Sequence, residues 1–349
     1  MGHAAVENKT PFAFENLFLT DEEARPIFVP IQKATYTLGV DEGVQLAETP
    51  IPILPAGVPN GNPGKSSYRY EPESAFIKPA TDVILIGHAH AGRVTTALLQ
   101  VRFRVGGLEK TVQVIGDRYW VKSLGGEYSS PPEPFEKIPL IYERAFGGWD
   151  RSHPDPNMHA FEPRNPVGTG FRSKHGKFED GIRLPNIEDP KNLIRNYGDT
   201  PPPAGFGFTS PDWQPRASFA GTYDEQWTNE RMPLLPKDFD RRFFNAASPG
   251  LIAPGYLKGD EAVLVENASP RGTISFNLPG VPPPECRVQL VGNRDVRVET
   301  KLDTVIINTD EDLLILIWRG HLAVRNGPHD VVSIQIQAEG VSAPSAAVR

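Results

Sequence analysis

Proline and glycine are the feature that most limits how this chain can fold. There are 36 prolines and 32 glycines among 349 residues, roughly a fifth of the chain, against about 12% in average proteins. Proline removes a helical hydrogen bond and glycine disfavours the helix, so such a frequency interrupts helices every few residues. Helical bundles, coiled coils and helix-pair solenoids are therefore nearly excluded. Apolar residues still make up 39% of the sequence, so the chain can bury a core.

The charge balance is mildly acidic. The 36 Lys and Arg residues against 43 Asp and Glu residues give a formal net charge of −7. A general nucleic-acid binder needs a basic face to displace counterions, so that class of function is disfavoured. The single cysteine, Cys286, rules out an internal disulfide and any multi-cysteine metal site. We expect Cys286 to be a buried apolar residue in a strand.

The sequence carries no targeting or membrane-spanning pattern. Its N-terminal residues lack the basic start and apolar run of a signal peptide. The longest apolar stretch, Leu313 to Trp318, is far too short to cross a membrane. These observations favour a cytoplasmic protein without a membrane partner. Residues 338–349 are mostly small, so we expect a disordered tail there.

Strand patterns fill both ends of the sequence. Residues 1–124 and 260–337 are rich in β-branched and alternating segments, which predicts a mainly β fold with two antiparallel β modules. In Val94–Val105 the apolar residues alternate with Arg102 and Arg104. The other expected strands are Ile27–Leu38, Val44–Leu46 (a hairpin with the preceding strand), Thr81–Ile86, Thr111–Ile115, Val263–Val265, Thr273–Leu278, Arg287–Val291, Val296–Thr300, Thr304–Asn308, Leu313–Trp318 and Val331–Ile336.

Two short segments of the first module recur in the second. VQVIGDR, which begins at Val112, matches VQLVGNR from Val288, and VILIGHA from Val83 resembles AVLVENA from Ala262. The two matches keep their order and nearly the same offset. This arrangement favours an internal duplication over a chance similarity between strand ends.

The middle region, residues 125–259, has a different texture. About a quarter of its residues are proline or glycine, yet it holds more than half of the aromatic residues of the chain. Flexible linkers lack aromatics, so we expect an ordered, irregular region packed on the two modules. Short strands are predicted at Leu140–Arg144 and Arg216–Gly221. One short helix is predicted at Lys237–Ala246, because Pro236 precedes it and its phenylalanines share a face.

Two histidine-bearing segments suggest metal ligands. His88 and His90 lie two apart after an expected strand, and imidazoles on one side of a strand suit a metal or a general base. Five potential ligands follow Trp149 within one tight loop: Asp150, His153, Asp155, Asn157 and His159. Neither segment matches a known ligand spacing. A strand end and ordinary turn residues explain them better, so we predict no metal and no cofactor.

Other signatures of catalysis are weak. PNGNPGKS, which ends at Ser66, resembles a phosphate-binding loop but lacks the first glycine and a following helix, so nucleotide binding is rejected. The Gly-x-Ser-x-Gly and His-Glu-x-x-His patterns are absent from the sequence. A carboxylate pair for sugar chemistry stays open, with Glu143, Glu188 and Asp224 as candidates in the aromatic-rich middle. We therefore predict no catalytic residues, with a carbohydrate-active enzyme as a minor alternative.

The arginines and tryptophans in the middle region, or just before it, form a more informative set. Arginine beside aromatics and glycines commonly binds loop carbonyls and carboxylates, which stabilises irregular backbone. Tryptophan either anchors a core or dominates a binding surface. We take seven residues as candidates for partner binding or for bracing of the irregular region: Trp149, Trp213, Trp227, Arg231, Arg118, Arg144 and Arg216.

A series of ordered motifs carries a family resemblance. They include GDRYW from Gly116, PFEKIPLIYERAFGGWD from Pro134, NPVGTGF from Asn165, WQPRASFAGTYDEQW from Trp213 and RMPLLPKDFDRRFFNAA from Arg231. In this order they resemble the bacterial domain-of-unknown-function family 2169, over about residues 12 to 320. Some members carry C-terminal pentapeptide repeats, which are absent from this sequence.

The resemblance implies a role in protein secretion. Members of this family are similar to accessory proteins encoded with type VI secretion systems. Such accessory proteins load toxic effectors onto the spike proteins of the system. It therefore implies a cytoplasmic adaptor or chaperone whose partners are a toxin effector and a spike protein. A structural component of the injection apparatus is the alternative. The family implies no catalytic residues.

Overall fold

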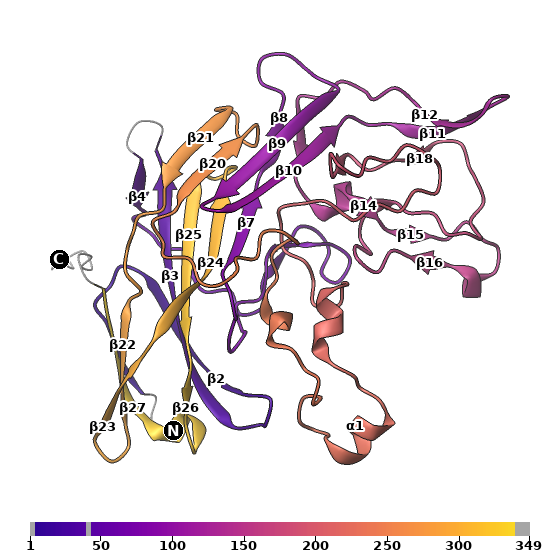
Figure 1. Cartoon of the computed structure of the whole chain (residues 1–349). Helices are drawn as coiled ribbons and strands as arrows, with labels where there is room; N and C mark the ends of the chain where they lie inside the picture. Colours follow the sequence, from indigo (N-terminus) through magenta and orange to yellow (C-terminus); the bar gives the residue numbers. More distant parts are fainter. Residues whose placement is uncertain (1–3, 40–42, 339–349) are drawn as a thin grey trace.

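The computed structural model describes residues 4–39 and 43–338 of the chain, and it is mainly β (Figure 1). Its central sheet has the order β2-β3-β25-β24-β7, with β4 and β26 also paired to β3. Neighbours are antiparallel except β24 and β7, which are parallel. The bounds are β2 Ala13–Thr20, β3 Pro26–Leu38, β4 Val44–Leu46, β7 Asp82–Ile86, β24 Thr300–Asn308, β25 Leu313–Gly320 and β26 Leu322–Ala323.

Two further large sheets flank the central one (Figure 1). The five-stranded sheet has the order β19-β10-β9-β20-β21, and the four-stranded sheet has the order β1-β27-β22-β23. Their bounds are β9 Leu98–Val105, β10 Leu108–Ile115, β19 Ile187–Glu188, β20 Ala262–Glu266 and β21 Thr273–Asn277, and β1 Ala5–Asn8, β22 Glu285–Leu290, β23 Arg294–Val298 and β27 Val331–Gln337.

The remaining elements are short. The small sheets are formed by β5 Val58–Pro59 with β6 Tyr68–Tyr70, β8 His88–His90 with β13 Lys137–Pro139, β12 Gly126–Ser129 with β11 Tyr119–Ser123 and β18 Ile182–Arg183, β14 Phe146–Gly147 with β17 Thr169–Gly170, and β15 Trp149–Asp150 with β16 Ala160–Phe161. The helices are α1 Glu225–Glu230 and the 3₁₀ turns η1 Tyr142–Arg144, η2 Pro156–Met158, η3 Arg216–Ala220, η4 Arg241–Phe244 and η5 Gly327–Asp330.

The mainly β prediction is confirmed, and the sheets reveal how the two strand-rich regions combine. Strands from residues 1–124 pair with strands from residues 260–337 in all three large sheets: β7 with β24, β9 with β20, and β1 with β27. The two regions therefore share their sheets in space. The proposed duplicates end β10 and β22, which lie in different sheets, and the duplication itself stays a prediction. Residues 339–349 of the expected tail lie outside the described residues.

Burial follows the strand patterns of the sequence. β7 is buried over its whole length, as the continuous β-branched run from Thr81 to Ile86 predicts. β24 and β25 are almost wholly buried as well. On β9, Val101, Phe103 and Val105 are fully buried, while Arg102 and Arg104 lie on the outer face. One large apolar cluster joins the central and five-stranded sheets, and a second joins the four-stranded sheet to Phe28 of β3.

Three local predictions in the middle region are wrong. The segments predicted as strands at Leu140–Arg144 and Arg216–Gly221 instead contain the 3₁₀ turns η1 and η3, without a strand ladder in those turns. The helix predicted at Lys237–Ala246 is reduced to η4, where the Asp240 carboxylate accepts a hydrogen bond from the Arg242 N–H. The α-helix lies earlier, at α1. Its N-cap, Asp224, accepts a hydrogen bond from the Trp227 N–H.

A buried network of charged side chains fastens the middle region to the central sheet. Lys78 donates to Asp82 at 2.8 Å, and the Asp82 carboxylate also accepts from Asn245 and from the Ala246 N–H. Arg216 forms an ion pair with Glu71. The other members are two ion pairs, Lys33 with Glu73 and Arg319 with Asp303. All eight charged members of these pairs are buried, and burial raises the pKa of Asp303.

The single cysteine gives a simple test of the packing. Cys286 lies on β22 and is fully buried, as predicted. Burial raises the pKa of its thiol to about 12. At pH 8 the native protein is therefore expected to react with a thiol reagent far more slowly than the urea-unfolded protein, because the thiolate is the reactive form. Equal labelling rates in the two states would contradict the packing of this sheet.

Candidate partner-binding surface

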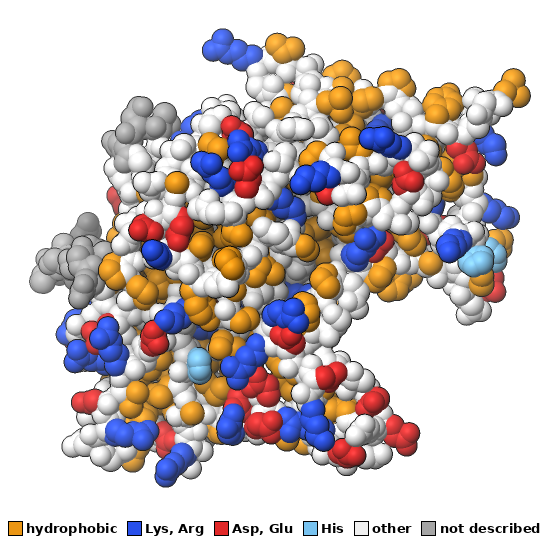
Figure 2. All heavy atoms as spheres, viewed as in Figure 1, with side chains coloured by type: hydrophobic (Ala, Val, Ile, Leu, Met, Phe, Trp, Pro, Cys, Tyr) orange, Lys and Arg blue, Asp and Glu red, His pale blue; other side chains and the backbone are white. Residues whose placement is uncertain are grey.

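Two parts of the chain, formed mostly by the middle region, project from the three large sheets, which we call the β body (Figure 1). The first, which we call the arm, comprises β11, β12 and β14 to β18. It is built on an apolar cluster of its own, formed by Trp120, Phe146, Ile182, Leu184 and Ile194. The second, which we call the α1 lobe, comprises residues 222–238 around α1. A notch separates the arm from the α1 lobe in the space-filling view (Figure 2).

The arm presents an exposed aromatic pair. Trp149 of β15 lies opposite Phe161 of β16, and their rings stack with centroids 4.6 Å apart. The two residues are 46% and 42% exposed. The Arg151 guanidinium lies 4.9 Å from the centroid of the Trp149 ring, within cation–π range. In Figure 1, β15 and β16 form the side of the arm nearest the α1 lobe, so the strands that carry the pair border the notch.

Two glycines explain how the sequence forms this hairpin. Gly147 and Gly148 directly precede Trp149 and have φ values of 151° and 91°. A Cβ on Gly147 would lie 2.1 Å from the Asn165 carbonyl oxygen, and one on Gly148 would lie 2.3 Å from that of Gly168. Only glycine permits both the backbone conformation and this close approach. The FGG sequence therefore places β15 and its tryptophan at the edge of the arm.

Asp150 fixes the loop beneath the aromatic pair. Its buried carboxylate accepts hydrogen bonds from the N–H and hydroxyl groups of Ser152 and of Ser173. Burial works to raise the pKa of Asp150, but these hydrogen bonds outweigh it and lower the pKa from 3.8 to about 2. Its donors are protein groups, which leaves Asp150 a structural role. The described residues contain no cluster of three His, Cys, Asp or Glu side chains suited to a metal ion.

Removal of this carboxylate should loosen the arm locally. We expect Asp150→Ala to speed amide hydrogen exchange in residues 149–176, because five donors, including the Arg172 guanidinium, lose their buried acceptor. Exchange in β24 and β25 should stay unchanged. Since the pKa of Asp150 is lowered in the folded arm, its contribution of about 2 kcal/mol is complete above pH ~4 and is lost as the pH falls toward 2. Unchanged exchange in 149–176 at pH 7 would contradict this role.

Three of the candidate arginines bind other groups of the protein itself. Arg118 forms a buried ion pair with Glu188. Arg144 donates to the Asn186 side chain at 3.1 Å. Arg216 donates to the carbonyl oxygens of Thr209 and Phe243 in addition to its ion pair with Glu71. These contacts are of the kind that the scaffolding interpretation of the sequence expects.

The other two tryptophans differ from Trp149. Trp213 is 2% exposed and packs edge to face on Tyr142, so it is a core residue. Trp227 lies on α1, half-buried, and donates its indole N–H to the Leu234 carbonyl oxygen at 2.9 Å. Tyr223 packs against Trp227 with ring centroids 4.7 Å apart. Tyr223 and Met232 are 53% and 62% exposed, so the α1 lobe also presents apolar side chains.

Arg231 holds the α1 lobe to the β body. It donates to the Leu235 carbonyl oxygen at 2.7 Å and makes two hydrogen bonds to the Glu23 carboxylate, in the turn between β2 and β3. Arg241 pairs with Glu22 in the same turn. A cavity of about 270 Å³ lies beside Trp227 and Arg231. Arg231 is thus a bracing residue that places Trp227 next to an open cavity.

The candidate catalytic groups are already occupied. Glu143 accepts from the N–H and hydroxyl of Ser67, Glu188 accepts from Arg118 and the Ile194 N–H, and Asp224 caps α1. His88 contacts Asp310, with 2.8 Å between its Nδ1 and a carboxylate oxygen. Burial, with the charge of His88, lowers the pKa of His90. Neither set forms a pair of free carboxylates or a metal site in the described residues.

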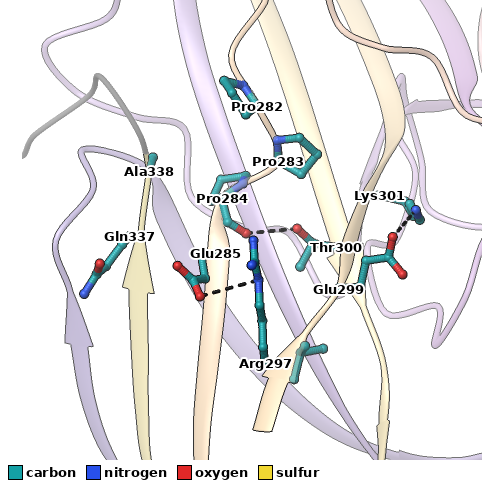
Figure 3. Close-up of a pocket in the computed structure, with 11 residues that line it drawn as sticks. Pro282, Pro283, Pro284, Glu285, Arg297, Glu299, Thr300, Lys301, Gln337 and Ala338 are labelled. Carbon is teal, nitrogen blue, oxygen red and sulfur yellow. Dashed lines mark hydrogen bonds and ion pairs between the residues drawn. The ribbon is translucent and has the colours of Figure 1, made fainter.

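A larger groove lies elsewhere, at the joint between the four-stranded and central sheets (Figure 3). It has a volume of about 710 Å³ and is lined by Pro282, Pro283 and Pro284 together with polar residues at the ends of β22, β23 and β27. Its charged groups pair with one another, Arg297 with Glu285 and Lys301 with Glu299. Among the described residues that line the groove, each charged side chain therefore has a partner of opposite charge.

Sequence reasoning missed part of the surface. Phe161 and Arg151 flank Trp149 in space but carry no motif of their own. A signal was present, because Trp149 and Phe161 bracket a segment rich in Asp-Pro and His-Pro steps that closes a hairpin.

Among the described residues, no helix is long and apolar enough to cross a membrane.

Comparison with known proteins gives one match. A family model described as "Uncharacterized protein conserved in bacteria (DUF2169)" matches residues 23–319, which include the arm and the α1 lobe. No curated protein matches the chain, and neither does any solved structure.

Proposed function

Because the chain belongs to the bacterial DUF2169 family, we propose that it is a cytoplasmic adaptor or chaperone that binds a toxic effector and helps to load it onto the spike of a type VI secretion system. The secretion role follows from the resemblance of the sequence motifs to that family. The observation that carries the binding role is the stacked and exposed Trp149–Phe161 pair at the edge of the arm, with the Arg151 guanidinium over the Trp149 ring.

The chemistry of the notch suits a protein partner. Trp, Tyr and Arg contribute most of the energy of protein interfaces, and contiguous exposed apolar side chains mark interaction sites. The arm supplies Trp149, Phe161 and Arg151, and the α1 lobe supplies Tyr223 and Met232. Both parts are braced by buried or paired arginines, so the surface is preformed. Binding should therefore cost little conformational entropy.

Co-expression gives the test of this proposal. We expect one product of the neighbouring genes, an effector or a spike protein, to co-elute with the chain on size exclusion as a stable complex. Deletion of the gene should abolish secretion of that effector while the injection apparatus still assembles. If the chain instead elutes alone beside every neighbouring product and is found as a component of purified particles, the adaptor role is contradicted in favour of a structural one.

A further inference from the structure

The five-stranded sheet ends in an open strand, β21. β21 pairs with β20 on one side, and no described strand lies on its other side. Its five residues, TISFN, contain no charged residue and no proline. Natural proteins usually protect such edges with charges, proline, bulges or very short strands, since an open edge can pair with another chain.

The other described edge strands show how unusual β21 is. β23 carries charges at Arg294, Asp295 and Arg297, and β1, β2 and β12 each carry a glutamate. β4 has only three residues, and β18 and β19 have two each. β7 is wholly buried, and its outer edge bonds to the Leu251 and Phe206 carbonyls. β21 is therefore the longest uncharged and exposed edge among the described strands.

The hydrogen-bond pattern identifies which groups of β21 face outward. The Leu278 N–H donates to the Glu261 carbonyl, and the Asn267 N–H donates to the Gly272 carbonyl. In an antiparallel pair such bonds recur at every second residue, so Ile274 and Phe276 bond to β20. The backbone N–H and C=O groups of Thr273, Ser275 and Asn277 point away from the sheet. Their side chains are also exposed.

We propose that β21 pairs antiparallel with β21 of a second copy of this chain, about a two-fold axis at Ser275. In this register Thr273 lies opposite Asn277 of the second copy, and Ser275 lies opposite its own counterpart. Each residue whose backbone N–H and C=O groups point away from β20 then lies opposite another such residue. The three pairs together give about six backbone hydrogen bonds. The contact is self-complementary, as a two-fold interface requires.

The side chains of this register are compatible as well. Small neutral residues meet on the outer face, so no like charges are opposed. On the inner face, Ile274 lies beside Phe276 of the second copy, which covers the part of that half-buried ring still exposed. In Figure 1 β21 lies at the opposite side of the molecule from the arm and the α1 lobe. The dimer therefore leaves the notch of each copy open. The proposed dimer does not rest on the proposed function.

Disulfide trapping tests the register directly. In a hydrogen-bonded antiparallel pair the Cα atoms lie about 5.5 Å apart, within the range of a disulfide. We expect Ser275→Cys to form a covalent dimer when oxidised glutathione is added. Thr273→Cys is the matched control, because its counterpart lies four residues away along the strand, about 13 Å, and it should stay monomeric on a denaturing gel. The native Cys286 is buried and does not interfere.

Sedimentation velocity tests the same contact without a cross-link. We expect the wild type to shift from 38.4 kDa toward twice that mass as its concentration rises. Ser275→Pro removes an outward N–H without breaking a bond to β20, and it should raise the dimer dissociation constant at least about tenfold. Ser275→Ala, which keeps the N–H, should not. A monomer at all concentrations, with no disulfide in Ser275→Cys, would overturn the proposal.

Discussion

Asp82→Ala is expected to lower the free energy of unfolding by about 3 to 5 kcal/mol, because it leaves Lys78 buried without its closest counter-charge. Asp82 is fully buried at the start of β7. Its carboxylate holds Lys78, the Asn245 side chain and the Ala246 N–H at 2.8 to 2.9 Å. Glu71, at 3.5 Å, would remain as the ion-pair partner of Lys78.

Urea titration followed by tryptophan fluorescence measures this change. Asp295→Ala, on the exposed strand β23, is the matched control and should shift stability by no more than about 0.5 kcal/mol. Limited proteolysis should cut the middle region of Asp82→Ala near Asn245 before it cuts the sheets, since that anchor is lost. A loss below about 1 kcal/mol would mean that the buried network does not hold the middle region in place.

The second large effect concerns binding. Substitution of both Trp149 and Phe161 by alanine should weaken partner binding at least about 30-fold, equivalent to about 2 kcal/mol, because central aromatics carry most of an interface's energy. Folding should be little affected, since both rings are almost half exposed and contact mainly each other. Titration calorimetry with the co-purified partner gives the dissociation constant.

Tyr128→Ala is the matched control for this variant. Tyr128 is 50% exposed and lies on β12, on the far side of the arm from β15 and β16 in Figure 1. It should leave the dissociation constant unchanged. Equal affinity of the double variant and the wild type would show that the aromatic pair is not part of the binding surface.

The β body could be predicted well from the sequence, since its strands are long, apolar and regularly patterned. β3 and β25 appear close to their predicted bounds, while β9 begins at Leu98 and not at Val94. The order of strands within the sheets could not be predicted, because pairs such as β7 with β24 join residues more than 200 positions apart. The middle region was mispredicted locally because its backbone is held by side chains such as Arg216 and not by strand ladders.

The candidate surface was only partly visible in the sequence. Tryptophan identity alone does not distinguish Trp149, which is exposed, from Trp213, which packs on Tyr142 in the core. That difference depends on which neighbours the fold supplies. The buried network was also hidden, because Lys33, Asp303 and Arg319 look like ordinary surface charges until the sheets assemble around them.

The most direct measurement of the central claim is site-specific photo-cross-linking in cells that secrete the effector. A photoreactive phenylalanine analogue at Phe161 is predicted to capture an effector or spike protein, identified by mass spectrometry. The same analogue at Tyr128 should capture neither. An absence of any adduct at Phe161, or the same adducts at both positions, would contradict the account of the notch as the site where this protein holds its partner.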